Sequence, residues 1–145
     1  MIFVKDNKFY HETNIRIRYA ETDKMGYSYY GNYPTFFEVG RTEFLREMGI
    51  SYKELEDLGY MLPITSLSIK YLKPAIYDDL ITVRTYLKYL HPIKVEFDYE
   101  IHNQQGELLT TGNTLLVFIS SKTRRPTKAP DFYTNIIKKF SKNLF

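Results

Sequence analysis

The segment AETDKMGYSYYGNYPTFFE, residues 20–38, places a carboxylate shortly before the start of a helix. Asn32 followed by Pro34 is typical of a helix N-terminus. An aspartate is ionised at neutral pH and can act as a nucleophile or as a general base. The first N–H groups of a helix lack intrahelical acceptors and suit a developing negative charge. The segment therefore predicts a reaction site built from Asp23 and the helix start, with a simple turn-capping role for Asp23 as the alternative.

A long amphipathic helix is expected directly after this segment, from residue 32 to residue 49. Gly49 is placed to end it, and residues 51–54 form a capping box that opens a short second helix. Gly40 lies on the apolar face and predicts a close approach of the helix to a sheet. Apolar and small side chains recur at the three- and four-residue spacing of one helix face, namely Tyr33, Phe36, Phe37, Gly40, Phe44, Leu45 and Met48.

Strand signals account for most of the remaining chain. They are period-two alternation of apolar and polar residues, or an apolar run typical of a central strand, in residues 11–20, 61–72, 80–90, 93–101 and 108–120. An amphipathic helix is expected at residues 131–141. Short connections between consecutive strands predict an antiparallel sheet, so the fold class is α+β. We expect a five-stranded antiparallel sheet wrapped around the long central helix, with the C-terminal helix covering part of its second face.

The stretch RIRYAETDKMGYSYYGNY, residues 16–33, resembles the signature of the 4-hydroxybenzoyl-CoA thioesterase family, whose members have the hot-dog fold. The matching positions are Arg16, Ile17, Thr22, Asp23, Gly26, Tyr30, Asn32 and Tyr33. FFEVGRTEFL, residues 36–45, is similar to the family's helix. KYLKPAIYDDL, residues 70–80, is similar to its strand, Pro turn and Asp pair. The similarity covers residues 15–130 and implies hydrolysis of an acyl-CoA to the free acid and CoA.

The resemblance also implies roles for individual residues. Asp23 is the catalytic carboxylate, and the backbone N–H of Tyr30 polarises the thioester carbonyl. Gly31 and Asn32, which follow Tyr30, belong to the substrate-binding set, with Asn32 also expected to cap the helix. Some relatives have a histidine at or near the position of Tyr30, and its absence here leaves Asp23 as the main catalytic group. Whether Asp23 is the nucleophile or the general base is left open.

The basic residues favour an anionic ligand. Net charge is +3, but residues 122–145 alone carry seven Lys or Arg and one Asp. Arg124 and Arg125, within residues 120–130, and Lys94 are the candidates for the CoA phosphates. This basic stretch lacks interleaved aromatic residues, so nucleic acid is not an expected partner. CoA is part of the substrate, and neither a cofactor nor a metal is expected.

Length and composition fit one enzyme domain spanning residues 1–145. The chain has no Cys, and its three His are not spaced as metal ligands. The N-terminus does not read as a signal peptide, and no apolar run is long enough to span a membrane. We expect a cytoplasmic protein with no membrane partner. The sheet would be completed by a second subunit in a homodimer or homotetramer.

Three further functions fit the same residues. An acyl-acyl carrier protein presents the same phosphopantetheine thioester as acyl-CoA, so an acyl-carrier-protein thioesterase fits equally well. A hot-dog dehydratase or hydratase usually pairs a carboxylate with a histidine, and no His lies between Glu12 and Leu90. A non-catalytic acyl-binding module would keep the fold without the reaction. The sequence does not indicate acyl chain length or a preference for aromatic acyl groups.

Overall fold

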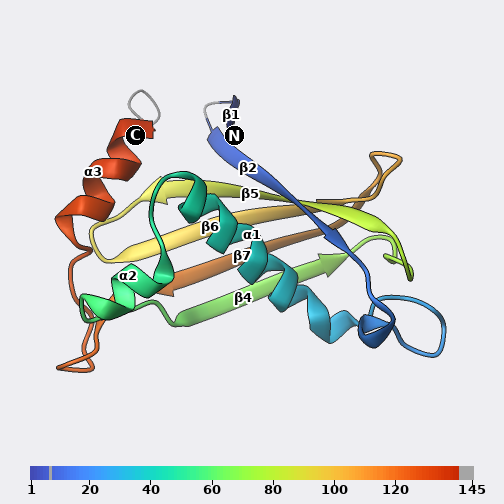
Figure 1. The fold of residues 1–145 in the computed structure, drawn as a ribbon, viewed down its shortest axis with the longest axis horizontal. Helices are drawn as coiled ribbons and strands as arrows, with labels where there is room; N and C mark the ends of the chain where they lie inside the picture. Colours follow the sequence, from blue (N-terminus) through green and yellow to red (C-terminus); the bar gives the residue numbers. More distant parts are fainter. Residues whose placement is uncertain (7, 141–145) are drawn as a thin grey trace.

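The computed structural model describes residues 1–6 and 8–140, and it shows a curved antiparallel sheet around one long helix (Figure 1). The six strands lie in the order β1-β2-β5-β6-β7-β4. A separate small sheet pairs β3 with β8. The strands are β1 (Ile2–Lys5), β2 (Lys8–Arg16), β3 (Tyr60–Met61), β4 (Ile64–Tyr71), β5 (Leu80–Leu90), β6 (Lys94–His102), β7 (Leu108–Val117) and β8 (Ile119–Ser120).

The hot-dog fold is confirmed, with one strand more than the five predicted for the sheet. The additional strand, β1, pairs with the start of β2 and is mostly exposed. A short exposed edge strand buries no face, so it leaves no clear alternation in the sequence. Two of the predicted strands are each divided. Residues 61–72 form β3 and β4, and residues 108–120 form β7 and β8, because the chain leaves the main sheet to build the small one.

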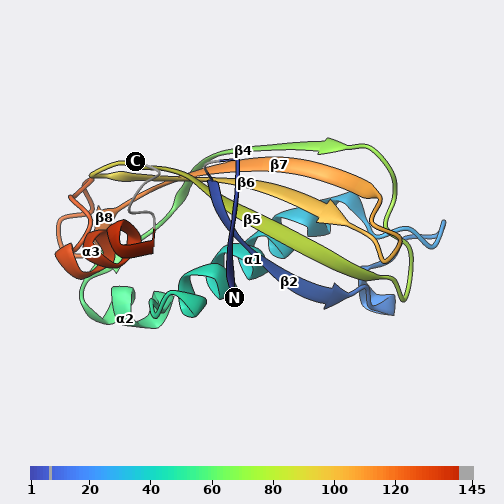
Figure 2. The ribbon, with the colours of Figure 1, turned by 90° about the horizontal axis from the view of Figure 1, so that it is seen from above.

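Helix α1 (Tyr33–Glu47) lies in the concave side of the sheet, as Figure 2 shows. Every residue of its predicted apolar face is buried, and so is Arg41, which lies close to Tyr52 and Tyr99. A Cβ atom on Gly40 would lie 2.5 Å from Oγ1 of Thr85, a residue of β5. The close approach predicted from Gly40 is therefore confirmed.

The centre of the core is a stack of two aromatic rings beneath β7. Phe37 of α1 and Tyr99 of β6 have ring centroids 4.2 Å apart and planes inclined by 10°. A Cβ atom on Gly112 would lie 2.3 Å from Cζ of Phe37. The bare backbone of Gly112 thus leaves the space that Phe37 occupies, and it fixes how closely α1 approaches the sheet.

The two shorter helices lie near the C-terminal end of α1. Gly49 has φ of +88°, and Ile50 N donates to the carbonyl of Leu45 at 2.8 Å, which ends α1 as predicted. Helix α2 (Tyr52–Asp57) starts at Ser51, whose Oγ accepts from the N–H of Glu54 at 3.1 Å. No helix in residues 1–6 and 8–140 is long and apolar enough to cross a bilayer.

Helix α3 (Asp131–Phe140) does not cover the second face of the sheet, which corrects the prediction. It lies at one end of the molecule on the same side as α1 (Figure 2), where Tyr133 packs edge-on against Phe118 with centroids 5.0 Å apart. Ser141, the predicted last residue of this helix, lies outside the described residues.

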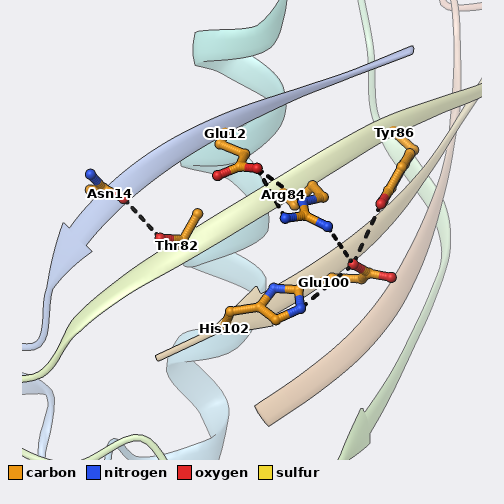
Figure 3. A network of polar contacts seen from close by, with 7 residues as sticks. All are labelled: Glu12, Asn14, Thr82, Arg84, Tyr86, Glu100 and His102. Carbon is orange, nitrogen blue, oxygen red and sulfur yellow. Dashed lines mark hydrogen bonds and ion pairs between the residues drawn. The ribbon is translucent and has the colours of Figure 1, made fainter. Parts of the chain in front are cut away.

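The second face of the sheet carries a polar network on β2, β5 and β6, which explains why this part of the face needs no helix (Figure 3). Arg84 Nη2 lies 3.0 Å from Oε1 of Glu12, and Arg84 Nη1 lies 3.5 Å from Oε1 of Glu100. Tyr86 donates its hydroxyl to the same Glu100 oxygen at 3.4 Å, and His102 Nε2 lies 3.8 Å from it. These half-buried polar groups hydrogen-bond or form ion pairs with one another, so this face can remain in contact with solvent.

Candidate active site

Asp23 begins a tight turn that leads into the start of α1. Its N–H donates to the carbonyl of Tyr27 at 2.8 Å, and its carbonyl accepts from the N–H of Gly26 at 3.0 Å. Gly26 has φ of +79°, a conformation that favours glycine. Thr22 and Ser28 bridge the base of the turn. These bonds hold the half-buried Asp23 in one place relative to the helix.

The Asp23 carboxylate uses one oxygen for structure and has the other available for chemistry. Its Oδ1 accepts from the N–H of Met25 at 2.9 Å and from that of Tyr27 at 3.2 Å. Its Oδ2 accepts no hydrogen bond from any residue that the structure describes. The turn-capping and catalytic interpretations of Asp23 are therefore compatible, because different oxygens serve them.

A 3-10 turn, η2 (Tyr30–Asn32), precedes α1 and changes the role predicted for Asn32. Asn32 already has helical φ and ψ of −82° and −16°, and its side chain makes no capping hydrogen bond. Its Nδ2 donates instead to the carbonyl of Glu21 at 2.7 Å, and the N–H of Tyr29 donates to the same carbonyl at 2.8 Å. Asn32 therefore ties the helix start to the chain just before Asp23. The N–H groups of the first helical turn, those of Tyr30 and Gly31 among them, lack intrahelical acceptors.

A cavity of about 350 Å³ brings the two predicted catalytic residues together. Asp23 and Tyr30 both line it. Gly31 and Asn32 adjoin it through Tyr30 but do not line it. The other lining residues are Met25, Tyr27, Ser28, Tyr33, Tyr71, Leu72, Lys73 and Pro74.

Two of the lining residues that were not singled out from the sequence have hydroxyl groups that bear on the site. Tyr71, at the end of β4, donates its hydroxyl to the carbonyl of Tyr30 at 2.7 Å. Burial raises the pKa of Tyr71, so the phenol remains a donor at neutral pH. Ser28 is only 6% exposed, and its hydroxyl has no partner among the described residues. Tyr71 has a sequence signal, since it lies in the segment that resembles the family's Pro turn, whereas Ser28 has none.

The three basic candidates for CoA binding lie far from Asp23 within one chain. Lys94 starts β6, and Arg124 and Arg125 lie in the segment of residues 120–130 that begins at the end of β8. These segments are at the end of the molecule where α1 stops, whereas the loop of residues 22–28 is at the end where α1 starts (Figure 1). Arg124 lines a different cavity of about 690 Å³, together with Tyr52 and Met61. A single chain therefore does not bring the predicted catalytic and phosphate-binding residues together.

The chemistry that this arrangement allows is acyl transfer to water. Asp23 and Tyr30, a residue of the helix start, line one cavity, and an attack on a carbonyl carbon requires a carboxylate and an N–H donor placed together in this way. Among residues 1–6 and 8–140, no group of three or more His, Cys, Asp or Glu side chains is placed to hold a metal ion.

Comparisons with known proteins agree with this chemistry. Residues 17–137 match the sequence profile of the Thioesterase-like superfamily. A solved DHNA-CoA thioesterase from Staphylococcus aureus is 38% identical, with a TM-score of 0.85 over 92% of this chain and 89% of that one. Bacillus subtilis YneP, whose name assigns it provisionally to the acyl-CoA thioesterases, is 32% identical over 83% of this chain and 90% of its own. The acyl-CoA thioester hydrolase YbgC of Escherichia coli is 27% identical over 80% of this chain and 87% of its own.

Proposed function

The chain belongs to the Thioesterase-like superfamily, and we propose that it hydrolyses acyl-CoA thioesters to free acid and CoA. The observation that carries the proposal is the cavity in which the Asp23 carboxylate meets the first turn of α1. The names of its relatives YneP and YbgC, and that of the solved S. aureus enzyme, support the same reaction class.

In the proposed mechanism the thioester carbonyl lies against the start of α1. The N–H of Tyr30 donates to the carbonyl oxygen and stabilises the negative charge that develops there. Asp23 Oδ2 either attacks the carbonyl carbon, giving an anhydride that water then hydrolyses, or removes a proton from the attacking water. Both routes form a C–O bond and break the C–S bond, and CoA leaves as the thiolate. Neither route requires a cofactor, since CoA is part of the substrate, and no step of either route uses a metal.

The proposal includes a second copy of the chain bound at β4. This strand forms an edge of the sheet and carries exposed apolar side chains, with Ile64 41% and Leu67 43% exposed. Such an edge is a template for strand pairing. Antiparallel pairing of two β4 strands about a two-fold axis would bring the Ile64 end of one against the Tyr71 end of the other. A homodimer, alone or within a homotetramer, is the assembly that fits this edge.

This dimer would also give the basic residues a function. The start of β6, with Lys94, and the segment of residues 120–130, with Arg124 and Arg125, lie at the same end of the molecule as the start of β4 (Figure 1). In the paired arrangement they would approach the Asp23 cavity of the other copy. We therefore propose that they bind CoA phosphates across the subunit interface, as charge-assisted donors.

The reaction is tested by measuring thiol release from short, long and aromatic acyl-CoAs, with the same acyl groups on acyl carrier protein. We expect hydrolysis of at least one acyl-CoA at a kcat typical of enzymes, above about 1 per second. Preference for the carrier-protein thioesters would instead identify an acyl-carrier-protein thioesterase.

A hydratase and a binding module would each give a distinct outcome with the same substrates. Hydration of crotonyl-CoA without thiol release would identify a hydratase. Binding of acyl-CoAs with no turnover across the whole panel would identify a binding module and overturn the proposal.

A further inference from the structure

Tyr71 joins the edge strand β4 to the first turn of α1. Its hydroxyl donates to the carbonyl oxygen of Tyr30 at 2.7 Å, across 41 positions of the sequence. Its ring meets that of Tyr33 edge-on, with centroids 5.0 Å apart and planes at 85°, and that of Tyr30 at 6.5 Å and 84°. Tyr71 thus contacts the helix start both by a hydrogen bond and by ring packing.

The residue four positions after Tyr30 leaves its carbonyl without an α-helical donor, although the 3-10 pattern of η2 still offers it the N–H of residue 33. In a regular α-helix that carbonyl would accept from the N–H of residue 34. Residue 34 is Pro, which has no N–H. The phenol of Tyr71 therefore donates to a carbonyl that has lost its α-helical partner.

The same bond acts on the amides at the site. The carbonyl of Tyr30 and the N–H of Gly31 belong to one peptide group, so a hydrogen bond to the oxygen polarises that N–H and fixes the orientation of its plane. The N–H of Tyr30, which is the donor proposed for the thioester carbonyl, belongs to the preceding peptide group of the same turn. Donors of this kind act only when they point at the developing oxyanion, and small misplacements are costly in rate.

We propose that Tyr71 is a positioning residue for the thioester hydrolysis, holding the η2 turn so that the N–H of Tyr30 points at the thioester carbonyl. This inference rests on the proposed function. Tyr71 itself acts through the backbone and takes no proton in the reaction.

The test is the variant Tyr71→Phe, which keeps the ring and removes only the hydroxyl. We expect kcat to fall about 10-fold, as for the loss of one aligning hydrogen bond, with KM changed less than about 2-fold. The matched control is Tyr77→Phe. Tyr77 is 52% exposed and does not line the cavity, so its variant should keep the wild-type kcat.

A rescue experiment separates positioning from a general structural role. Para-aminophenylalanine at position 71 keeps an N–H donor at the same place and should restore most of kcat, whereas para-methoxyphenylalanine should not. Wild-type kcat in Tyr71→Phe, or a loss that the amino analogue fails to restore, would overturn this inference alone. Absence of thiol release by the wild type would instead overturn the proposed function, and this inference with it.

Discussion

The two ends of α1 differ in cavity size, charge and exposure. At its start lie Asp23, exposed tyrosines and a cavity of about 350 Å³. At its end lie α2, α3 and the basic segment of residues 122–125, beside a cavity of about 690 Å³ that Arg124 lines. The larger cavity is not the candidate site. What identifies the smaller one is the convergence of a carboxylate and unpaired amides, which cavity volume does not measure.

Helix polarity explains why the chemistry is expected at the start. The N-terminal end of a helix carries unpaired N–H groups and a partial positive charge, and the C-terminal end carries unpaired carbonyls. At the end of α1 the carbonyl of Leu45 is already taken by the N–H of Ile50. An oxyanion would be stabilised at the first end and repelled at the second. Substitutions at the two ends should therefore have unequal effects.

The largest difference is expected from Asp23→Asn. Removal of the carboxylate eliminates the nucleophile or general base and should lower kcat by about 100- to 10,000-fold, while the amide keeps an oxygen that can accept from Met25 and Tyr27. The unfolding midpoint in urea should therefore change little. The measurement is thiol release on the best substrate of the panel.

Asp57→Asn is the control for that variant. Asp57 lies in α2, where it forms an exposed ion pair with Lys53 at 2.9 Å. Exposed pairs contribute little, so this variant should keep its activity. Equal activity of Asp23→Asn and wild type would remove the distinction between the two ends.

The close packing of α1 against the sheet, between its two ends, can be tested at Gly112. An added Cβ would lie 2.3 Å from Cζ of Phe37, so Gly112→Ala should lower the free energy of unfolding by about 1–3 kcal/mol. Gly40→Ala should cost less, because the gain of about 1 kcal/mol in helix propensity offsets part of the overpacking. Urea unfolding measures both, with Thr111→Ala on the polar face of β7 as the control. An unchanged midpoint for Gly112→Ala would mean that Phe37 can move at no cost.

The sequence predicts these packing elements well because they depend on local periodicity. The buried stripe of α1, the Gly49 stop and the Ser51 cap all follow from spacings within one segment, and all are confirmed. Asp23 and Tyr30 were predicted together for the same reason, since one loop carries both, and the cavity that they line agrees with that pairing. Their catalytic roles remain predictions.

The features that the sequence did not predict depend on contacts between distant segments. Burial of Arg41 reflects Tyr52 and Tyr99 on other elements, and the position of Tyr71 against Tyr30 reflects the end of β4. Asn32 has the composition of a cap, yet the 3-10 turn before it redirects its side chain to Glu21. A residue's type limits its hydrogen bonds, but only the folded chain determines the partner.

A smaller effect is expected at the basic end. If Arg124 binds a CoA phosphate of the second copy, Arg124→Ala should raise KM for acyl-CoA about 10-fold, as for one exposed charge-assisted hydrogen bond, and leave kcat unchanged. Mixed dimers distinguish the two arrangements. In a mixed dimer, the Arg124→Ala chain keeps Asp23 and the Asp23→Asn chain keeps Arg124. These two wild-type residues meet in one site only if each site spans two chains. A wild-type KM in the purified mixed dimer is then expected, whereas a KM that stays raised would confine Arg124 to its own chain.

The smallest effect is expected from the histidine beside the second half of α1. His11 is buried next to Phe44, with ring centroids 6.0 Å apart. Burial lowers the pKa of His11, and the nearby N-terminus acts in the same direction, against Glu47, Glu43 and Glu12. The folded state thus prefers the neutral imidazole.

The stability that His11 contributes is full above the unfolded pKa of about 6.5 and is lost as pH falls through the folded pKa. Urea midpoints should therefore drop between pH 7 and pH 5, and His11→Gln should flatten that slope. An equally steep slope in His11→Gln would assign the effect to other groups, with His102, whose pKa burial also lowers, as the next variant.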